Sequence, residues 1–375
     1  MPHLLTPEGL QEYLRTSHPQ WECTDLEVLS GSGGVANLTC RAKLSNQRQV
    51  VLKHAESVSG PGWSFPASRA VDENAVLTVL QSQQDIFDQD GPVRVQVPTP
   101  LAFFQESCVQ ISKYVPGGED LRSFLSRETI PTELANQIGK AFGSWAQRYH
   151  AWGRSAAAAE LRQRLKENNN VTMKHNLNCG IFEPSLDNFP ELSNTFSAAE
   201  LNDLKAMPPP PPSDRLGIIH GDFWCGNILI PTSLPNPLTL TLLDFELAQV
   251  STPPHDIGQL FAELYLLFHF KHRSEALTII EGFMLAYEDP ALSLDEAFTA
   301  AKDFGVHLVT WPWRVGWWGD VKSEAMVECA GYGVKCVRAV LDEDVGFFLG
   351  GPLGCLFRKV ASERNRGLER RLGSA

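Results

Sequence analysis

The 375-residue sequence has no CxxC pair, no cysteine–histidine cluster with zinc spacing and no apolar run long enough to cross a membrane. Its eight cysteines are scattered, which predicts free thiols in a reducing, cytoplasmic compartment. The beginning of the chain also lacks a basic region followed by an apolar run. It predicts a helix capped by Thr6 instead of a targeting segment. We therefore expect no membrane partner.

Basic residues are also in short supply. Lysine and arginine number 32 against 44 aspartate and glutamate residues, so the formal charge is −12. This balance argues against a nucleic-acid partner, because phosphate backbones are bound by clustered basic side chains. It is compatible with a cationic small substrate, although most acidic surfaces simply keep a protein soluble. No repeat or zipper pattern predicts an assembly, and we expect a monomer or a weak homodimer.

The order of the predicted elements indicates an α+β fold of two lobes. Strands alternate with turns in the first part of the chain, one helix follows, and the rest is mainly helical. The stretch 166–215 is weakly periodic, and its five consecutive prolines at 208–212 predict a stiff, extended spacer. We expect an N-terminal lobe at 1–115 and a C-terminal lobe at 116–375. The strands are expected at 25–29, 38–44, 50–55 and 109–115, and the helix at 68–83.

Several chemically active residues fall in and after the stretch HGDFWCGNIL. An apolar run follows Asn227, then a turn-rich segment, and LTLTLLD alternates in strand fashion up to Asp244. This pattern predicts a hairpin whose ends meet, so that Asn227 and Asp244 lie together with Asp222 from the preceding loop. Amide and carboxylate oxygens are ligands that Mg²⁺ takes alongside phosphate oxygens. A second carboxylate outside the metal shell can accept a proton from a hydroxyl.

For an isolated motif, the alternative is a polar hairpin whose aspartate and asparagine only cap turns. The complete string is more specific: His-Gly-Asp, four residues, Asn, a strand, a turn, a strand and Asp-Phe-Glu. It resembles the catalytic and metal-binding loops of the protein-kinase-like fold. In the glycine of His-Gly-Asp and the glutamate of Asp-Phe-Glu, the sequence resembles the aminoglycoside phosphotransferase branch of this fold. That branch includes choline kinase and methylthioribose kinase. The segments GSGGVANLTCRAKL, VVLKHA and HLVTWPWRVGWWG resemble fungal members that phosphorylate a hydroxyl of a small indole amine.

The resemblance implies transfer of the γ-phosphate of ATP to a hydroxyl group, with Mg²⁺ as the metal. It implies that Asp222 orients the acceptor hydroxyl and takes its proton, and that Asn227 and Asp244 hold Mg²⁺. It also implies that Lys53 holds the α and β phosphates and that Glu73 positions Lys53. Helical spacing supports this pair, because Glu73 falls on the apolar face of its own helix, where a carboxylate needs a partner.

The remaining nucleotide contacts are expected from two places. A glycine turn between the first two strands could cover the phosphates with backbone N–H groups, and Asn37 follows it. The resemblance places a connector between the lobes, whose backbone hydrogen-bonds adenine. It also implies that Asp256 braces the catalytic loop, with a helix cap as the alternative. The glycines are Gly31, Gly33 and Gly34, and the connector residues are Ile111, Lys113 and Val115.

The acceptor site has three candidate residues. Glu246 either attracts an ammonium group or only shapes the metal loop. Trp311 begins a cluster of four tryptophans that ends at Trp318; these either fill the larger lobe or wall the pocket and stack on an aromatic acceptor. Arg314 suits an acidic or phosphate group instead. We expect a small hydroxylated acceptor that carries an amine, with an aromatic ring as one form.

Three alternatives stay open at this stage. A methylthioribose-type sugar kinase would use the same machinery on a neutral acceptor. A protein kinase fits less well, because no long activation loop and no Ala-Pro-Glu motif follow Asp244. A nucleotide-binding regulator without catalysis is the third, and the intact set of Asp222, Asn227, Asp244 and Lys53 counts against it.

Overall fold

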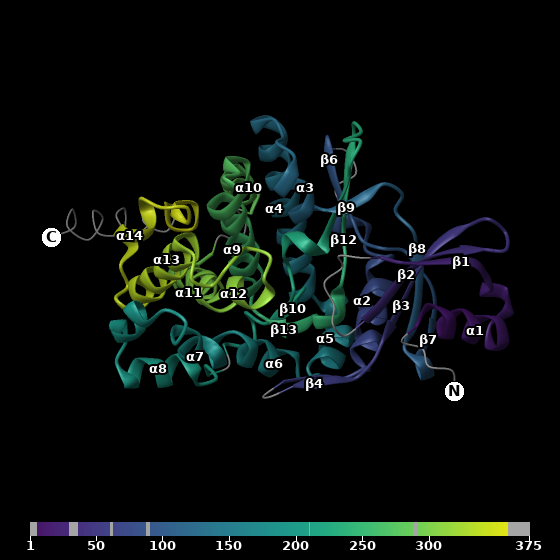
Figure 1. The fold of residues 1–375 in the computed structure, drawn as a ribbon, viewed down its shortest axis with the longest axis horizontal. Helices are drawn as coiled ribbons and strands as arrows, with labels where there is room; N and C mark the ends of the chain where they lie inside the picture. Colours follow the sequence, from purple (N-terminus) through teal and green to yellow (C-terminus); the bar gives the residue numbers. More distant parts are fainter. Residues whose placement is uncertain are drawn as a thin grey trace.

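The computed structural model describes residues 6–29, 37–60, 63–87, 91–209, 211–287 and 292–358. It has the expected α+β architecture, with an antiparallel sheet in the N-terminal part and a larger, mainly helical part (Figure 1). The predicted bilobal fold class is confirmed. The glycine turn expected at Gly31, Gly33 and Gly34 lies outside the described residues.

The N-terminal sheet forms because apolar residues alternate along its strands, so that one face is buried. Cys40, Ala42, Val50 and Leu52 are fully buried on that face, against the first helix. Thr6 caps this helix, as predicted, by accepting a hydrogen bond from the Gly9 backbone N–H at 3.1 Å. The helix is α1 (Pro7–Ser17), and the antiparallel strands in spatial order are β1 (Cys23–Val28), β2 (Asn37–Leu44), β3 (Gln49–Ala55), β8 (Val109–Lys113) and β7 (Pro100–Phe104).

The helix that follows these strands is α2 (Arg69–Leu80), close to the predicted bounds. Val76, Leu77 and Leu80 bury its apolar stripe. Glu73 is on the same buried side and is only 3% exposed. The short strands β4 (Val58–Gly60) and β5 (Trp63–Phe65) pair with each other just before it.

A second sheet carries the predicted hairpin between the N-terminal sheet and the helices (Figure 1). Its central strands are antiparallel, and Ile228, Ile230, Leu240 and Leu242 are buried in the main core. In order, the strands are β6 (Val93–Gln96), β12 (Leu238–Leu242), β11 (Ile228–Pro231) and β9 (Gly118–Asp120). Nearby, β10 (Gly217–Ile219) pairs with β13 (Gln249–Ser251). The lobe boundary at 115/116 stays a prediction; β6 precedes that point in the chain yet pairs with β12.

The helical part is built around two closely packed helices, α4 (Thr132–Arg154) and α10 (Ser274–Ala286). None of the helices in the described ranges combines the length and the apolar character needed to span a membrane. Outside the stretch 166–215, the other helices of this part are α3 (Leu121–Arg127), α5 (Ala159–Leu165), α9 (Pro254–Lys271), α11 (Leu294–Thr310), α12 (Pro312–Val315), α13 (Glu324–Leu341) and α14 (Val345–Leu349).

The weakly periodic stretch 166–215 contains three α-helices. Its helices are α6 (Asn170–Leu177), α7 (Phe182–Leu186) and α8 (Ala198–Lys205), and we refer to the stretch as the insert. Phe182, Leu186, Phe196 and Leu204 are buried in a small core of their own against α11 and α13. The insert is therefore packed onto the helical part.

The tryptophan cluster also departs from a packed helix. The helix α12 has only four residues, and the chain turns at Gly316, which has a φ of 68°. Trp318 is buried in the main core, whereas Trp317 is 41% exposed. Trp313 packs against the main core and Trp311 against a smaller apolar cluster, so Trp317 is the exposed member of the four.

Candidate active site

The predicted catalytic loop, residues 220–227, follows β10 and is held by one buried carboxylate. Asp256, in the first turn of α9, accepts hydrogen bonds from the backbone N–H groups of His220 and Gly221 at 2.8 and 2.9 Å. Its side chain is fully buried and also bonds His150 at 3.0 Å. Burial alone would raise the pKa of Asp256, but the hydrogen bond and charge of His150 lower it below its usual value. The geometry matches the bracing role implied for this residue.

Glycine is required between His220 and Asp222. Gly221 has a φ of 78°, and a Cβ atom there would lie 2.0 Å from the carbonyl oxygen of Leu247. No other residue fits this turn without moving the loop.

Asp222 is surrounded by hydrogen-bond donors. Oδ1 accepts from Lys174 Nζ at 2.9 Å and from Gln259 Nε2 at 2.8 Å. Oδ2 accepts from Trp224 Nε1 at 3.1 Å and from Asn227 Nδ2 at 3.0 Å. Burial raises the pKa of Asp222, but the charge of Lys174 and the bond from Gln259 outweigh it, and the pKa is lowered. The carboxylate is thus ionised at neutral pH.

The hairpin brings its two ends together as predicted. Ile228 pairs with Leu242, and the Leu243 backbone N–H donates to the Asn227 carbonyl oxygen at 2.7 Å. Asp244 follows directly, with a left-handed φ of 67°. Asn227 uses its amide N–H groups on Asp222, which leaves its Oδ1 as the atom that could ligate a metal.

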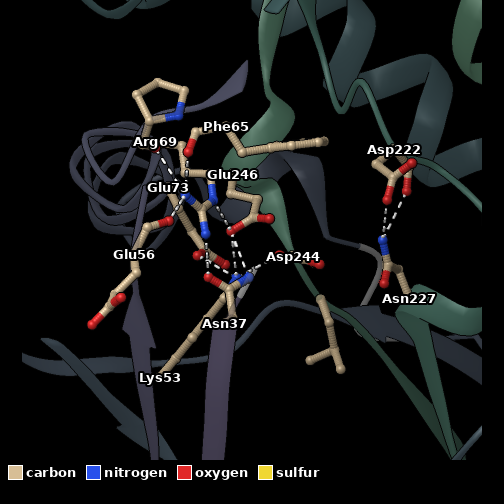
Figure 2. Close-up of polar contacts among 12 residues, drawn as sticks. Asn37, Lys53, Glu56, Phe65, Arg69, Glu73, Asp222, Asn227, Asp244 and Glu246 are labelled. Carbon is tan, nitrogen blue, oxygen red and sulfur yellow. Dashed lines mark hydrogen bonds and ion pairs between the residues drawn. The ribbon is translucent and has the colours of Figure 1, made fainter. Parts of the chain in front are cut away.

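Lys53 lies at the centre of an acidic cluster (Figure 2). Its Nζ is 2.7 Å from Glu73 Oε2 and 3.3 Å from Glu246 Oε2, and it also contacts the Asp244 carboxylate. Burial would lower the pKa of Lys53, but the carboxylates, Asp244 first, raise it well above its usual value. Burial and then Glu246 raise the pKa of Asp244 to about 8. The Lys53–Glu73 pair is present as predicted.

Glu246 is held on its other side by two further residues. Arg69 Nε lies 3.1 Å from Glu246 Oε2, and Asn37 Nδ2 donates to the same oxygen at 2.9 Å. Burial raises the pKa of Glu246, but Lys53 and Arg69 outweigh it and lower it below its usual value. A carboxylate that is 7% exposed and bound by two cations favours the loop-shaping role over attraction of an acceptor ammonium.

The same contacts change the expected role of Asn37. Its amide is used by Glu246 and by Arg69 Nη2, which donates to Asn37 Oδ1 at 2.8 Å, so it is bound within the acidic cluster. The connector residues also differ in their surroundings. Ile111 is buried mid-sheet between Leu52 and Ala102, and the Lys113 backbone N–H donates to the Thr99 carbonyl oxygen. This pairing favours Val115, which follows the strand, as the backbone contact for a nucleotide.

Trp311 and Arg314 lie beside the insert. Trp311 Nε1 donates to Asn178 Oδ1 at 2.7 Å, and its ring is stacked on His307 with centroids 6.0 Å apart. The Arg314 guanidinium lies over the Trp311 ring, 4.6 Å from the ring centroid, and donates to the Leu177 carbonyl oxygen.

A cavity of about 330 Å³ opens beneath the insert, next to the catalytic loop. Lys174 and Gln259, which both contact Asp222, form part of its wall. Asp303 also lines it and pairs with His255 Nδ1 at 2.5 Å. Burial raises the pKa of Asp303, but His255 outweighs it and lowers the pKa, so the cavity contains a carboxylate. Apolar surface comes from Val171, Met207, Pro208, Leu216 and Val250.

Two residues of the site could not be recognised as such from the sequence. Lys174 comes from the insert, where weak periodicity hid its helix, and Arg69 looks like an ordinary helix-start residue. The one local signal in the insert is the capping box of Ser197 and Glu200, which marks the start of α8.

The donor set fits a divalent cation. Glu73, Asp244 and Glu246 each offer an oxygen, and these atoms lie within 4.8 Å of one another. Together with Asn227 Oδ1 they are hard ligands of the type that Mg²⁺ takes. These three carboxylates face only Lys53 and Arg69 as cationic partners among the described residues, so a cation would offset the remaining negative charge.

The geometry agrees with comparisons to known proteins. A family profile described as the phosphotransferase enzyme family matches residues 27–284, more than half of the chain. The chain belongs to the phosphotransferase enzyme family. The matched segment contains Lys53, Glu73, the catalytic loop and the hairpin, and it confirms the resemblance to small-molecule kinases.

Two curated relatives are similar over most of their length. Phosphotransferase FrzJ from Cladobotryum sp is 28% identical over 321 residues, which cover 79% of this chain and 82% of that protein. A 4-hydroxytryptamine kinase from Psilocybe cyanescens is 24% identical over 355 residues, which cover 87% of this chain and 91% of that protein.

Two solved structures share the fold. The GDP complex of an aminoglycoside 2′-phosphotransferase-IIIa mutant has a TM-score of 0.51 at 14% identity and covers 91% of this chain and 99% of its own. The structure of amicoumacin kinase in complex with AMP-PNP and Ca²⁺ has a TM-score of 0.50 at 12% identity. The match covers 89% of this chain and 93% of that chain. At these identities the likeness establishes the protein-kinase-like fold alone.

Proposed function

We propose that the chain transfers the γ-phosphate of ATP to a hydroxyl group of a small molecule that carries an amine. The contact that carries this proposal is made by Lys53 of the N-terminal sheet, which pairs with Glu73 of α2 and with Asp244 at the end of the hairpin. A buried lysine placed between two such acids is suited to hold phosphate groups beside a metal. Asp222 lies in the loop that precedes the same hairpin.

Each residue then has a defined task. Lys53 holds phosphate oxygens, and Glu73 keeps its ammonium group in place. Asp244 and Asn227 Oδ1 hold Mg²⁺, which supplies positive charge for the phosphate oxygens. Asp222 orients the acceptor hydroxyl and takes its proton. Positioning and charge neutralisation account for the catalysis, as expected for phosphoryl transfer.

The nucleotide assignment draws on the relatives as well as on the site. The two solved structures of this fold are complexes with GDP and with AMP-PNP, and the second also contains Ca²⁺. We assign ATP with Mg²⁺ to this chain, with the backbone at Val115 as the contact for the base. Binding assays with ATP and GTP in parallel test the choice of base.

The cavity beneath the insert is the acceptor site in this proposal. Its volume of about 330 Å³ suits a small molecule, and its apolar wall suits a hydrocarbon or aromatic body. Asp303 lines that wall with its partner His255 and is the carboxylate that would meet the ammonium group. The similarity to a 4-hydroxytryptamine kinase supports an aromatic hydroxyamine as one form of the acceptor.

An acceptor screen tests the proposal. The purified protein is given ATP and Mg²⁺ with hydroxylated amines, with matched alcohols that lack the amine, and with neutral sugars such as methylthioribose. We expect ADP release and a phosphate ester, detected by phosphorus NMR, with hydroxylated amines.

Asp303→Asn provides the matched control for acceptor charge. It should weaken the use of amines, seen as a higher KM, and leave turnover of amine-free alcohols unchanged. A preference for the neutral sugar that salt does not alter would remove the amine from the proposal and leave the kinase reaction in place. No ester with any acceptor, together with no ATP binding, would overturn the function as a whole.

A further inference from the structure

Lys174 is the one basic side chain of the insert that contacts the catalytic loop among the described residues. It lies on α6, and its Nζ is 2.9 Å from Asp222 Oδ1 and 3.1 Å from Gln259 Oε1. Its side chain is 12% exposed. Gln259 donates from its other amide atom to Asp222, so the three side chains form a closed triangle. The insert is thus part of the site and does more than cover it.

The triangle has a consequence for the reaction. A carboxylate offers about four lone-pair positions in its plane. The donors Lys174, Gln259, Trp224 and Asn227 already fill those positions on Asp222. An acceptor hydroxyl can therefore bond Asp222 only after one donor has left. Lys174 is the donor with a net charge, and it is the one that a phosphate group attracts most strongly.

Lys174 also has bonding capacity to spare. An ammonium group carries three N–H donors. Two are used by Asp222 and Gln259, and the described part of the chain supplies no partner for the third. The side chain has a flexible four-carbon stem, so the ammonium group can move while α6 stays in place.

Building on the proposed kinase function, we propose that Lys174 is a catalytic residue that moves from Asp222 to the γ-phosphate when the nucleotide binds. The shift frees one lone pair of Asp222 Oδ1 for the acceptor hydroxyl. The acceptor oxygen then forms a bond to the γ-phosphorus as the bond to the β–γ bridging oxygen breaks. The hydroxyl proton passes to Asp222, ADP leaves, and Lys174 neutralises the oxygens of the transferring group.

The first test is kinetic and compares Lys174→Met with Lys174→Arg. Methionine keeps the length and apolar stem of the side chain but cannot bind a phosphate. We expect kcat to fall by about 100-fold in Lys174→Met, with the KM for ATP changed only a few-fold. Lys174→Arg should recover part of kcat because it keeps the charge. Lys205→Met, at an exposed position of the insert, should behave as wild type. A kcat for Lys174→Met within about threefold of wild type overturns the inference.

The second test needs no acceptor. Aluminium fluoride with ADP and Mg²⁺ mimics the transferring phosphoryl group, and we expect it to tighten ADP binding by the wild-type protein. Lys174→Met should lose most of that gain while its affinity for ADP alone is unchanged. Gln259→Leu should keep the gain, because Gln259 holds Asp222 and Lys174 but has no charge that could neutralise the phosphate oxygens. If Lys174 merely held Asp222 in place, the gain would survive in Lys174→Met, and that result overturns the inference alone. A wild-type protein that gains nothing from aluminium fluoride overturns it as well, and one that binds no ADP overturns the proposed function.

Discussion

Single residues in the acidic cluster show why the site is suited to a cation. Glu73, Asp244 and Glu246 surround Lys53, and burial keeps water from screening their repulsion. Arg69, at the start of α2, offsets the negative charge of Glu246. The carboxylate left without full compensation is Asp244, which also stands at the left-handed position where the hairpin ends. A metal held there would relieve the repulsion and bind phosphate at the same time.

The metal assignment predicts a specific loss for Asp244→Asn. Asparagine tolerates the left-handed conformation, so the backbone is kept while the charge is removed. We expect turnover to fall by at least about 100-fold at ordinary Mg²⁺ concentrations, with an unchanged melting temperature. Asp295→Asn, in the exposed first turn of α11, is the control. Wild-type activity in Asp244→Asn across a Mg²⁺ titration would contradict the assignment.

Asp222→Asn tests the proton acceptor. The substitution keeps the shape of the side chain and removes its charge and its ability to take a proton. We expect kcat to fall by about two to four orders of magnitude, with nucleotide affinity nearly unchanged. Steady-state kinetics and calorimetric ATP binding on the same preparation measure both quantities. If ATP binding fell strongly while kcat persisted, Asp222 would have to be a structural or metal-binding residue.

The sequence predicted those residues whose role depends on local spacing. Asp222, Asn227 and Asp244 belong to one continuous loop and hairpin, so their positions followed from the strand pattern. Glu73 could be paired with Lys53 because a carboxylate on a buried helix face needs a partner. Lys174 could not be placed, because its contact with Asp222 depends on how the insert packs across 48 positions of the chain.

At the level of elements, the helical part depends on the close approach of α4 and α10. Gly139 and Gly143 of α4 face the backbone of α10 directly: a Cβ atom on them would lie 2.2 Å from the Ile279 carbonyl oxygen and 2.1 Å from that of Phe283. From the other side, a Cβ atom on Gly282 would lie 2.6 Å from the Asn136 carbonyl oxygen. The fixed position of α4 supports His150, which in turn bonds Asp256 beneath the catalytic loop.

This contact predicts opposite effects for two glycine-to-alanine substitutions. Alanine is the better helix former by about 1 kcal/mol. In Gly143→Ala the clash with the backbone of α10 outweighs that gain, and we expect destabilisation at the upper end of the about 1–3 kcal/mol typical of overpacking. Gly331→Ala in α13 has its nearest neighbour at 3.9 Å and should be stabilising. Urea unfolding of both variants measures the difference, and equal stability would contradict the proposed close packing.

Some of the elements could be predicted from the apolar pattern of the sequence alone. Apolar alternation defined β2, β3 and the hairpin, because one buried face fixes both the strand and its register. The helices α6 and α7 were missed because they are short and bury few residues, so tertiary packing and not periodicity defines them. The proline run after α8 was predicted as extended and is without regular structure where the chain is described.

For the whole molecule, the contact between the N-terminal sheet and the hairpin passes through a few buried charges. Arg69 Nη1 donates to the backbone carbonyls of Glu56 and Pro66 at 2.7 and 2.9 Å, and its Nε and Nη2 reach Glu246 and Asn37. One guanidinium thereby connects α2, the start of β2 and the segment after Asp244. Because Lys53 bonds the same segment, the proposed phosphate binding at Lys53 would depend on the relative position of the two parts.

Arg69→Met should therefore loosen the whole N-terminal part and not only the nearest side chains. It removes the side-chain donor of the Glu56 and Pro66 carbonyls and leaves Glu246 with one cation fewer, at a cost of about 3–5 kcal/mol for a broken buried pair. Arg127→Met removes a pair on the exposed α3 surface and should cost about 0–1 kcal/mol. Hydrogen exchange should be faster throughout β3 and α2 in Arg69→Met, and the double variant Arg69→Met/Glu246→Gln should be less unstable than the sum of its single changes. Faster exchange confined to the first turn of α2, with β3 unchanged, would mean that Arg69 fixes only its own helix and that the two parts are joined by Lys53 alone.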